Sequence, residues 1–239
     1  MELLSVKNLT KLYKNNRGIK NLNLTIYEGE VVALLGPNGA GKTTAIKSII
    51  GFSKKTNGEV AITGYSPETD IEKAMLETGV MVGKSAHYEY LSGYKNLKIH
   101  SELYRDITEQ KILKVLEYVE LLAYKDEKVA NYSTGMKQRL AFAKALLHEP
   151  KLLLIDEPFS GLDIEGRAIM KNILKKMSYE NNVGILISSH LINDINDIAT
   201  KVCIIHHNQW LETRDVEKIF EKYNDLEEYY LDRVKGKVV

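Results

Sequence analysis

Two glycine-containing segments of this 239-residue chain have residue types and spacings that suit phosphate groups. The first, G-P-N-G-A-G-K-T at Gly36 to Thr43, follows the apolar run Val31 to Leu35 and matches G-x-x-x-x-G-K-[ST]. The second, Y-S-T-G-M-K-Q-R at Tyr132 to Arg139, places Ser133 before a run that can form a helix, Met136 to Leu147. A helix N-terminus with free N–H groups and a nearby hydroxyl attracts anions. The sequence therefore predicts two separate anion sites.

The first segment, which we call the P-loop, has the chemistry of a nucleotide site. Its glycines let the backbone curl so that several N–H groups converge on the β-phosphate of ATP, and Lys42 adds a positive charge for the β- and γ-oxygens. The Thr43 hydroxyl can coordinate Mg²⁺. A helical run, Thr44 to Ile50, follows the loop, as the motif requires. The predicted nucleotide-binding residues here are Gly36, Pro37, Asn38, Gly39, Ala40, Gly41, Lys42, Thr43 and Thr44.

Polar residues at the ends of two buried strands supply the remaining chemistry. Asp156 and Glu157 follow the run L-L-L-I, at the sheet edge where open α/β sheets bind ligands. Asp156 is the predicted metal partner, through water, and Glu157 is the predicted general base for an attacking water. His190 ends I-S-S-H at the same edge; it suits a γ-phosphate contact, and a structural role is equally open. Tyr13 suits adenine stacking, although its residue type alone favours packing at the sheet edge.

The elements that must position these residues are strands of two kinds. Leu22, Leu24 and Ile26 alternate, which predicts a half-buried strand beside an opening strand at Leu3 to Val6, as an antiparallel edge. Short apolar runs typical of strands buried on both faces of a parallel sheet are Val31 to Leu35, Val80 to Val82, Leu152 to Ile155, Ile185 to Ile187 and Val202 to Ile205.

Helices are predicted in the middle and at the end of the chain. Thr108 is an expected N-cap of an amphipathic helix from Thr108 to Leu122, and no strand signal occurs between Lys84 and His148. A charged helix pair is expected from Val216 to Val234. We therefore expect an α/β core formed by residues 1–83 and 149–214, a helical insertion at 84–148 and C-terminal helices at 215–239.

The composition argues against several classes of protein. Lys and Arg total 33 against 32 Asp and Glu, so no overall positive charge favours nucleic acid, and no nucleic-acid partner is expected. No apolar run approaches the roughly 18 residues that span a bilayer, which predicts a cytoplasmic protein unless a partner holds it at a membrane. The lone Cys203, in V-C-I-I, is expected to be a buried small hydrophobe, with a catalytic role as the alternative.

The order of these segments resembles the ATP-binding subunits of ABC transporters, from about Val6 to Trp210. The P-loop is followed by Tyr132 to Arg139, the Asp-Glu strand end, S-G-L-D at Ser160 to Asp163 and the strand-end His190. The family's signature segment is usually L-S-G-G-Q; this chain keeps Ser133 and Gly135 and differs at the other places. The resemblance implies a P-loop NTPase of the ABC ATPase type, with a mixed sheet, antiparallel edge strands and an inserted helical subdomain.

The resemblance also implies roles that spacing alone does not show. Ser133 and Gly135 would contact ATP held by the P-loop of a second ATPase subunit, in a head-to-tail dimer. A helix N-terminus contributes about 0.3 to 2 kcal/mol toward an anion, so the signature segment can only complete a site built elsewhere. Tyr13 would stack on adenine, Asp163 would contact the partner and His190 would contact the γ-phosphate. A separate membrane permease is the implied second partner, which would hold the chain at the inner face of the cell membrane.

One position departs from the family, and several motifs indicate a branch of it. The family has a Gln or Glu after the strand that here reads T-G-V-M-V, whereas this chain has Gly83 followed by Lys84. Leu91 to Leu97 and S-S-H-L-I-N-D-I are similar to ATPases of bacitracin and lantibiotic export or self-protection. An aromatic stretch, with His87, Tyr88, Tyr90 and Tyr94, is a candidate permease contact or part of the core. Ion or lipid export, a soluble ABC protein acting on ribosomes or DNA, and a P-loop kinase or GTPase are the alternatives.

Overall fold

A single mixed sheet organises the chain in the computed structural model, which describes residues 1–83 and 86–235. Within this part of the chain nine strands pair in the order β4-β1-β2-β9-β8-β3-β7-β6-β5. Their bounds are β1 Glu2–Leu12, β2 Gly18–Tyr27, β3 Val31–Leu35, β4 Asn57–Ile62, β5 Thr78–Met81, β6 Leu152–Asp156, β7 Gly184–Ser189, β8 Lys201–His206 and β9 Gln209–Asp215.

The strands of the central sheet run parallel, and the flanking pairs run antiparallel. β3 pairs in parallel with β7 and β8, and β6 pairs in parallel with β5 and β7. β1 is antiparallel to β2 and β4, and β8 is antiparallel to β9. The two parts meet at the single parallel pair Lys20 and Gln209. The expected mixed sheet with antiparallel strands outside the parallel core is therefore confirmed.

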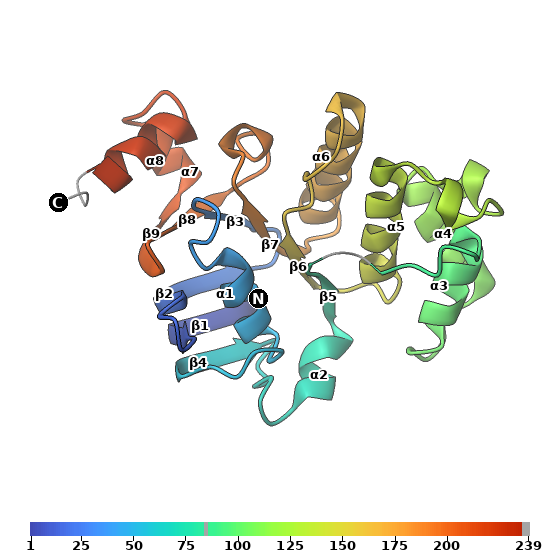
Figure 1. Cartoon of the computed structure of the whole chain (residues 1–239), viewed down its shortest axis with the longest axis horizontal. Helices are drawn as coiled ribbons and strands as arrows, with labels where there is room; N and C mark the ends of the chain where they lie inside the picture. Colours follow the sequence, from blue (N-terminus) through green and yellow to red (C-terminus); the bar gives the residue numbers. More distant parts are fainter. Residues whose placement is uncertain (84–85, 236–239) are drawn as a thin grey trace.

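Helices cover both faces of the sheet, as Figure 1 shows. Their bounds are α1 Lys42–Ile49, α2 Ile71–Leu76, α3 Gly93–Ser101, α4 Glu109–Tyr118, α5 Thr134–Leu146, α6 Ile164–Tyr179, α7 Val216–Phe220 and α8 Leu226–Lys235. Short 3-10 turns lie at Leu122–Tyr124, Val129–Asn131 and Ile192–Asp194. Helices α3, α4 and α5 lie together at one end of the molecule, away from α7 and α8 (Figure 1).

Alternation along the central strands divides the core into two apolar layers. Leu34, Leu154 and Leu186 pack with α1 on one face, whereas Leu35 and Ile187 face the layer that includes α5 and α6. Every residue of β3 and β7 is buried, as expected for parallel strands covered on both faces. This arrangement places the carboxyl ends of β3, β6 and β7 beside one another.

Several predicted elements differ from the structure in extent, among them the opening strand, expected at Leu3 to Val6 and found at Glu2–Leu12, and two helices. The helix expected from Thr108 to Leu122 has the expected N-cap, since Thr108 accepts a hydrogen bond from the Lys111 N–H, but it ends at Tyr118. Its end is set by Glu120, which adopts a left-handed φ of +57° that a helix does not tolerate. The helix after Ser133 begins two residues earlier than predicted, at Thr134.

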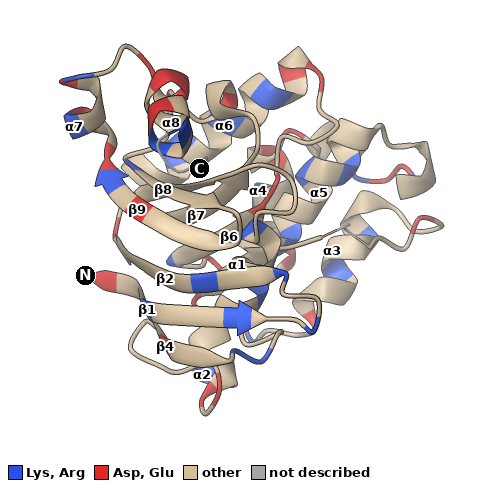
Figure 2. Ribbon diagram, turned by 60° about the vertical axis from the view of Figure 1, so that its left-hand side comes forward, with Lys and Arg blue, Asp and Glu red and all other residues tan. Residues whose placement is uncertain are grey.

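The distribution of charged residues over the molecule agrees with the balanced composition. Acidic and basic residues are interspersed along the ribbon rather than collected in one stripe (Figure 2). Cys203 is fully buried, and burial raises the pKa of its thiol to about 12, which confirms the structural rather than the catalytic role. Among residues 1–83 and 86–235, no helix is long and apolar enough to cross a membrane.

Candidate active site

The P-loop has a backbone conformation that only glycine permits at two of its positions. Gly39 and Gly41 have φ values of +81° and +110°, and Gly41 is the N-cap of α1. A Cβ on Gly41 would lie 2.0 Å from the Gly18 carbonyl oxygen, and one on Gly36 would lie 2.3 Å from the Ile205 carbonyl oxygen. The loop therefore packs closely against two strands and leads directly into the N-terminus of α1. This arrangement suits phosphate binding.

Lys42 is held inside the loop by carbonyl groups and a carboxylate. Its side-chain ammonium donates to the carbonyl oxygens of Gly36 at 2.7 Å and Pro37 at 3.3 Å, and lies 3.3 Å from Glu157 Oε1. The residue is only 5% exposed. A buried ammonium group requires such partners, and phosphate oxygens can replace them.

Thr43 and Asp156 form an oxygen-donor pair at the carboxyl end of β6. Thr43 Oγ1 donates to Asp156 Oδ2 at 2.8 Å, and the buried Ser188 hydroxyl donates to Asp156 Oδ1 at 2.6 Å. Mg²⁺ takes oxygen ligands and usually keeps several waters, with one or two protein ligands plus substrate phosphates. The pair fits such a site, although the described residues contain no group of three His, Cys, Asp or Glu side chains arranged to hold a metal ion by themselves.

Glu157 lies between Lys42 and His190, in a strained backbone conformation. Its Oε2 atom is 2.6 Å from His190 Nδ1, opposite the oxygen that faces Lys42. Glu157 has a φ of +52°, and its N–H donates to the Ser188 hydroxyl at 3.0 Å. Residues held at such φ values often belong to functional sites. The arrangement presents a carboxylate and an imidazole together at the mouth of the P-loop.

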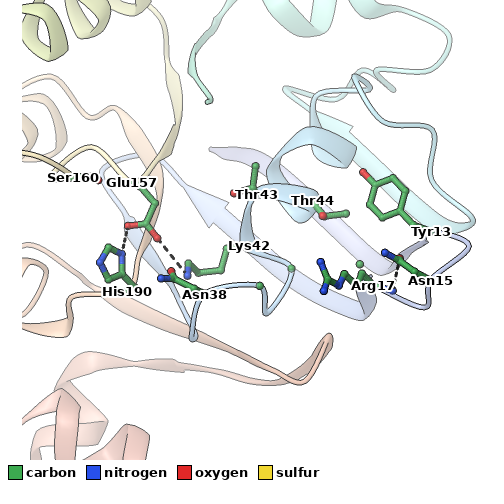
Figure 3. A pocket seen from close by; sticks show the side chains of 13 residues that line it. Tyr13, Asn15, Arg17, Asn38, Lys42, Thr43, Thr44, Glu157, Ser160 and His190 are labelled. Carbon is green, nitrogen blue, oxygen red and sulfur yellow. Dashed lines mark hydrogen bonds and ion pairs between the residues drawn. The ribbon is translucent and has the colours of Figure 1, made fainter. Parts of the chain in front are cut away.

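One cavity of about 480 Å³ collects most of these groups (Figure 3). Of the residues predicted from the sequence, Tyr13, Asn38, Gly39, Gly41, Lys42, Thr43, Thr44, Glu157 and His190 line it. Gly36 and Pro37 contribute through their carbonyl contacts to Lys42, and Ala40 is buried in the loop. Four lining residues escaped the sequence prediction, namely Asn15, Arg17, Gly18 and Ser160.

Tyr13 lies at one end of this cavity with its ring accessible. It is 43% exposed, its hydroxyl is 3.3 Å from Ser53 Oγ, and the Lys11 ammonium lies 5.0 Å from the ring centroid. The packing alternative at a sheet edge would bury more of the ring. Its exposure within the cavity suits stacking on a flat base.

Ser133, Gly135 and Asp163 line a second cavity, of about 570 Å³, whose lining includes no P-loop residue. Ser133 caps α5 by accepting a hydrogen bond from the Met136 N–H at 3.2 Å, and Gly135 lies in the first turn of the same helix. Asp163 caps α6 by accepting from the Gly166 N–H at 2.8 Å. Two helix N-termini therefore meet at this cavity, apart from Lys42.

Comparisons with known proteins agree with this geometry. The family described as ABC transporter matches residues 19–160. The chain is 39% identical to the uncharacterized ABC transporter ATP-binding protein YhcH of Bacillus subtilis, over 90% of this chain and 70% of that protein. It is 34% identical to the bacitracin transport ATP-binding protein BcrA of Enterococcus faecalis, over 99% and 76% of the two chains. The lantibiotic transport ATP-binding protein SrtF of Streptococcus pyogenes is 33% identical over 97% of each chain.

Solved structures extend the likeness to the fold. A structure titled ATP binding subunit of ABC transporter superposes with a TM-score of 0.85 at 28% identity, over 97% of this chain and 99% of that one. A dimeric bacterial ABC transporter cassette gives a TM-score of 0.80 at 26% identity, over 90% and 99%. These matches support the transporter prediction and not the ribosome- or DNA-acting alternative. The chain therefore belongs to the ABC transporter family, as an ATP-hydrolysing, ATP-binding subunit.

Proposed function

We propose that this subunit powers the export of antimicrobial peptides, or protection against them, as one of two ATPase copies docked on a membrane permease. The relatives named for bacitracin and lantibiotic transport favour this substrate class, at 33 to 35% identity. Such a permease would hold the chain at the inner face of the cell membrane. Ion or lipid export is the alternative, because the ATPase subunits of such exporters share many of the same sequence motifs.

The separation of the two cavities is the observation that carries the proposed dimer. Lys42, Glu157 and His190 line one cavity, whereas Ser133 and Gly135 line another. The contribution of a helix N-terminus, about 0.3 to 2 kcal/mol, is too small to hold ATP by itself. A second copy placed head to tail would bring its signature segment, Tyr132 to Arg139, against the nucleotide in the first copy's P-loop.

Hydrolysis in this proposal uses the groups that meet at the mouth of the P-loop. Thr43 and Asp156, the latter through water, would hold Mg²⁺, whose positive charge would offset the negative charge of the transferred phosphate. Lys42 would exchange its contacts with the Gly36 carbonyl and Glu157 for phosphate oxygens. Glu157 would then accept the proton of the attacking water, and His190 would orient that water and the γ-phosphate.

The permease would contact a surface beside the predicted aromatic stretch. Tyr88 and Tyr90 are 49% and 69% exposed and pack edge to face, whereas Tyr94 packs against the core. A cavity of about 410 Å³ lies between β5 and α5 and includes Ala86 and Lys144 in its lining. Exposed aromatic side chains are enriched at protein interfaces. Gly83, shortly after β5, has a φ of +78°, and Lys84 lies outside the described residues.

Three measurements test the proposal. ATP hydrolysis by the purified chain should fall to background in Lys42→Ala and Glu157→Gln; activity that persists in either variant contradicts the proposal.

Purification of the chain from membranes should recover a permease subunit, and recovery with ribosomes instead favours the soluble alternative. Loss of the gene in its host should raise sensitivity to bacitracin-like or lantibiotic peptides, and unchanged sensitivity contradicts the substrate class.

A further inference from the structure

The turn between β1 and β2 is fixed directly against the P-loop. Gly18, the first residue of β2, has its carbonyl oxygen against Gly41, at a separation that leaves no room for a Cβ on Gly41. The Asn208 side-chain amide, oriented with its nitrogen inward, donates to the Gly18 carbonyl at 3.2 Å and to the Gly39 carbonyl at 3.3 Å. One side chain from the β8–β9 hairpin thus ties the turn to the loop.

Hydrogen bonds within the turn define the position of Arg17. The Tyr13 N–H donates to the Arg17 carbonyl at 2.9 Å, and the Arg17 N–H donates to Asn15 Oδ1 at 3.1 Å. The Arg17 side chain reaches the same cavity as Gly39 and Gly41, and Figure 3 shows it between the P-loop and Asn15. Within residues 1–83 and 86–235, no carboxylate forms an ion pair with Arg17. Its guanidinium group is therefore available to a ligand in the cavity.

We propose that Arg17 binds the adenine-side part of the phosphate chain of the nucleotide, at the first phosphate. The inference rests on the nucleotide orientation of the proposed function, with the base on Tyr13 and the last phosphate at Lys42. Lys42 lies at the far end of the cavity, beside Glu157 and His190. A nucleotide that spans these two ends passes Arg17 between them. A guanidinium group can make two parallel hydrogen bonds to one phosphate, which a lysine cannot.

This position makes Arg17 a determinant of ADP affinity as well as ATP affinity. The first phosphate remains in place when the γ-phosphate leaves, so the contact is the same in substrate and product. An interaction of equal strength in the ground and transition states changes KM and leaves the chemical step unaltered. Lys42 differs, because its charge also faces the γ-phosphate that is transferred.

The test compares Arg17→Ala and Arg17→Lys with Lys14→Ala, which removes an equal charge from the same turn but does not line the cavity. Dissociation constants for ATP and ADP are measured by calorimetry, with kcat and KM from steady-state hydrolysis. Arg17→Ala should weaken ATP and ADP by the same factor, about tenfold, and keep kcat within about twofold. Arg17→Lys should recover only part of the affinity, and Lys14→Ala should match the wild type.

Other outcomes would contradict either the role of Arg17 or the proposed function. Unchanged ATP and ADP affinity in Arg17→Ala, weakening confined to ATP, or an equal loss in Lys14→Ala overturns the role of Arg17. A thermal unfolding temperature without nucleotide that matches the wild type shows that the fold is intact in each variant. If the wild-type chain binds ADP but does not hydrolyse ATP, the proposed function is wrong and the role of Arg17 in nucleotide binding still stands.

Discussion

At the scale of single residues, Glu157 links Lys42 of the P-loop to His190 at the end of β7. One carboxylate oxygen lies 3.3 Å from the Lys42 ammonium and the other lies 2.6 Å from His190 Nδ1. Binding of a terminal phosphate must therefore rearrange an existing network rather than fill an empty one.

We predict that Ser188 affects the Mg²⁺ requirement through its contacts with Asp156 and Glu157. Its hydroxyl donates to Asp156 at 2.6 Å and accepts from the Glu157 N–H at 3.0 Å, so it orients both carboxylate-bearing residues. Ser188→Ala should raise the Mg²⁺ concentration needed for half-maximal ATPase activity by about 10-fold or more, because such supporting groups typically contribute factors of 10 to 100. A magnesium titration of hydrolysis measures this shift.

Ser178→Ala is the matched control for that titration. Ser178 is equally buried and its hydroxyl donates to the Gly29 carbonyl oxygen at 2.6 Å, away from the carboxylates. It should lower stability without a change in the magnesium requirement. An equal shift in both variants, or none in Ser188→Ala, would contradict the orienting role of Ser188.

At the scale of elements, the signature segment depends on the start of α5. Gly135 lies in the first turn of this helix, and a Cβ there would meet Leu162 Cδ2 at 3.6 Å and Ser133 Oγ at 3.8 Å, which are ordinary contacts. Its missing side chain is therefore not required by the fold. The space in front of the helix N-terminus is instead available to a nucleotide held by another subunit.

Gly135→Ala should consequently separate assembly from stability. The fold should be unchanged or more stable, by at most about 1 kcal/mol, because alanine is the better helix former. The ATP-dependent dimer should be weaker, because the added methyl group faces the proposed phosphate position. Thermal unfolding and analytical ultracentrifugation with ATP measure the two effects. Dimerisation equal to that of the parent chain would contradict a direct approach of Gly135 to the nucleotide.

Helix α4 tests whether the helical insertion is stabilised by its own end signals. Thr108 Oγ1 accepts a hydrogen bond from the Lys111 N–H at 3.3 Å. Thr108→Ala should cost about 1 kcal/mol, which corresponds to a fall of about 2 to 4 °C in Tm for a chain of this size. Thr108→Ser, which keeps the hydroxyl, should restore most of the loss. A Tm unchanged by Thr108→Ala would show that packing alone holds the helix.

The sequence predicted strands and helices with a clear apolar pattern, and missed elements without one. Continuous apolar runs such as Val31 to Leu35 gave the parallel core strands, because they have no exposed face. Strands β4 and β9 are half-exposed and rich in polar residues, and they were not predicted. The contribution of Asn15 and Arg17 to the site was also unforeseen, because it depends on how a distant hairpin holds the turn against the P-loop.

At the scale of the whole molecule, partly buried histidines make the free energy of unfolding depend on pH in the acid range. Burial, and then the positive charge of Lys144, lower the pKa of His87 to about 4 from its usual 6.5. Its Nε2 atom is 3.0 Å from the Lys137 carbonyl oxygen, whereas Nδ1 is buried and has no hydrogen-bond partner among the described residues. Burial lowers the pKa values of His100 and His148 as well. As pH falls below 6.5, these histidines take up protons in the unfolded chain but stay neutral in the native chain. The free energy of unfolding therefore decreases.

His87→Gln should reduce this dependence while keeping the hydrogen bond to the Lys137 carbonyl. Urea unfolding at pH 7 and pH 5 measures it: the loss of unfolding free energy between the two should be smaller in the variant than in the wild type. The same loss in His87→Gln as in the wild type would contradict the assignment to His87.

The assembly of two copies around ATP is the central claim, and Glu157→Gln tests it most directly. This variant keeps the size of the side chain, but its amide cannot take the proton from water, so bound ATP should persist. With saturating ATP and Mg²⁺, light scattering should give twice the mass of the 27.1 kDa chain, whereas ADP should give the monomer. A monomer in saturating ATP, with nucleotide binding verified in the same sample, would contradict the proposed dimer.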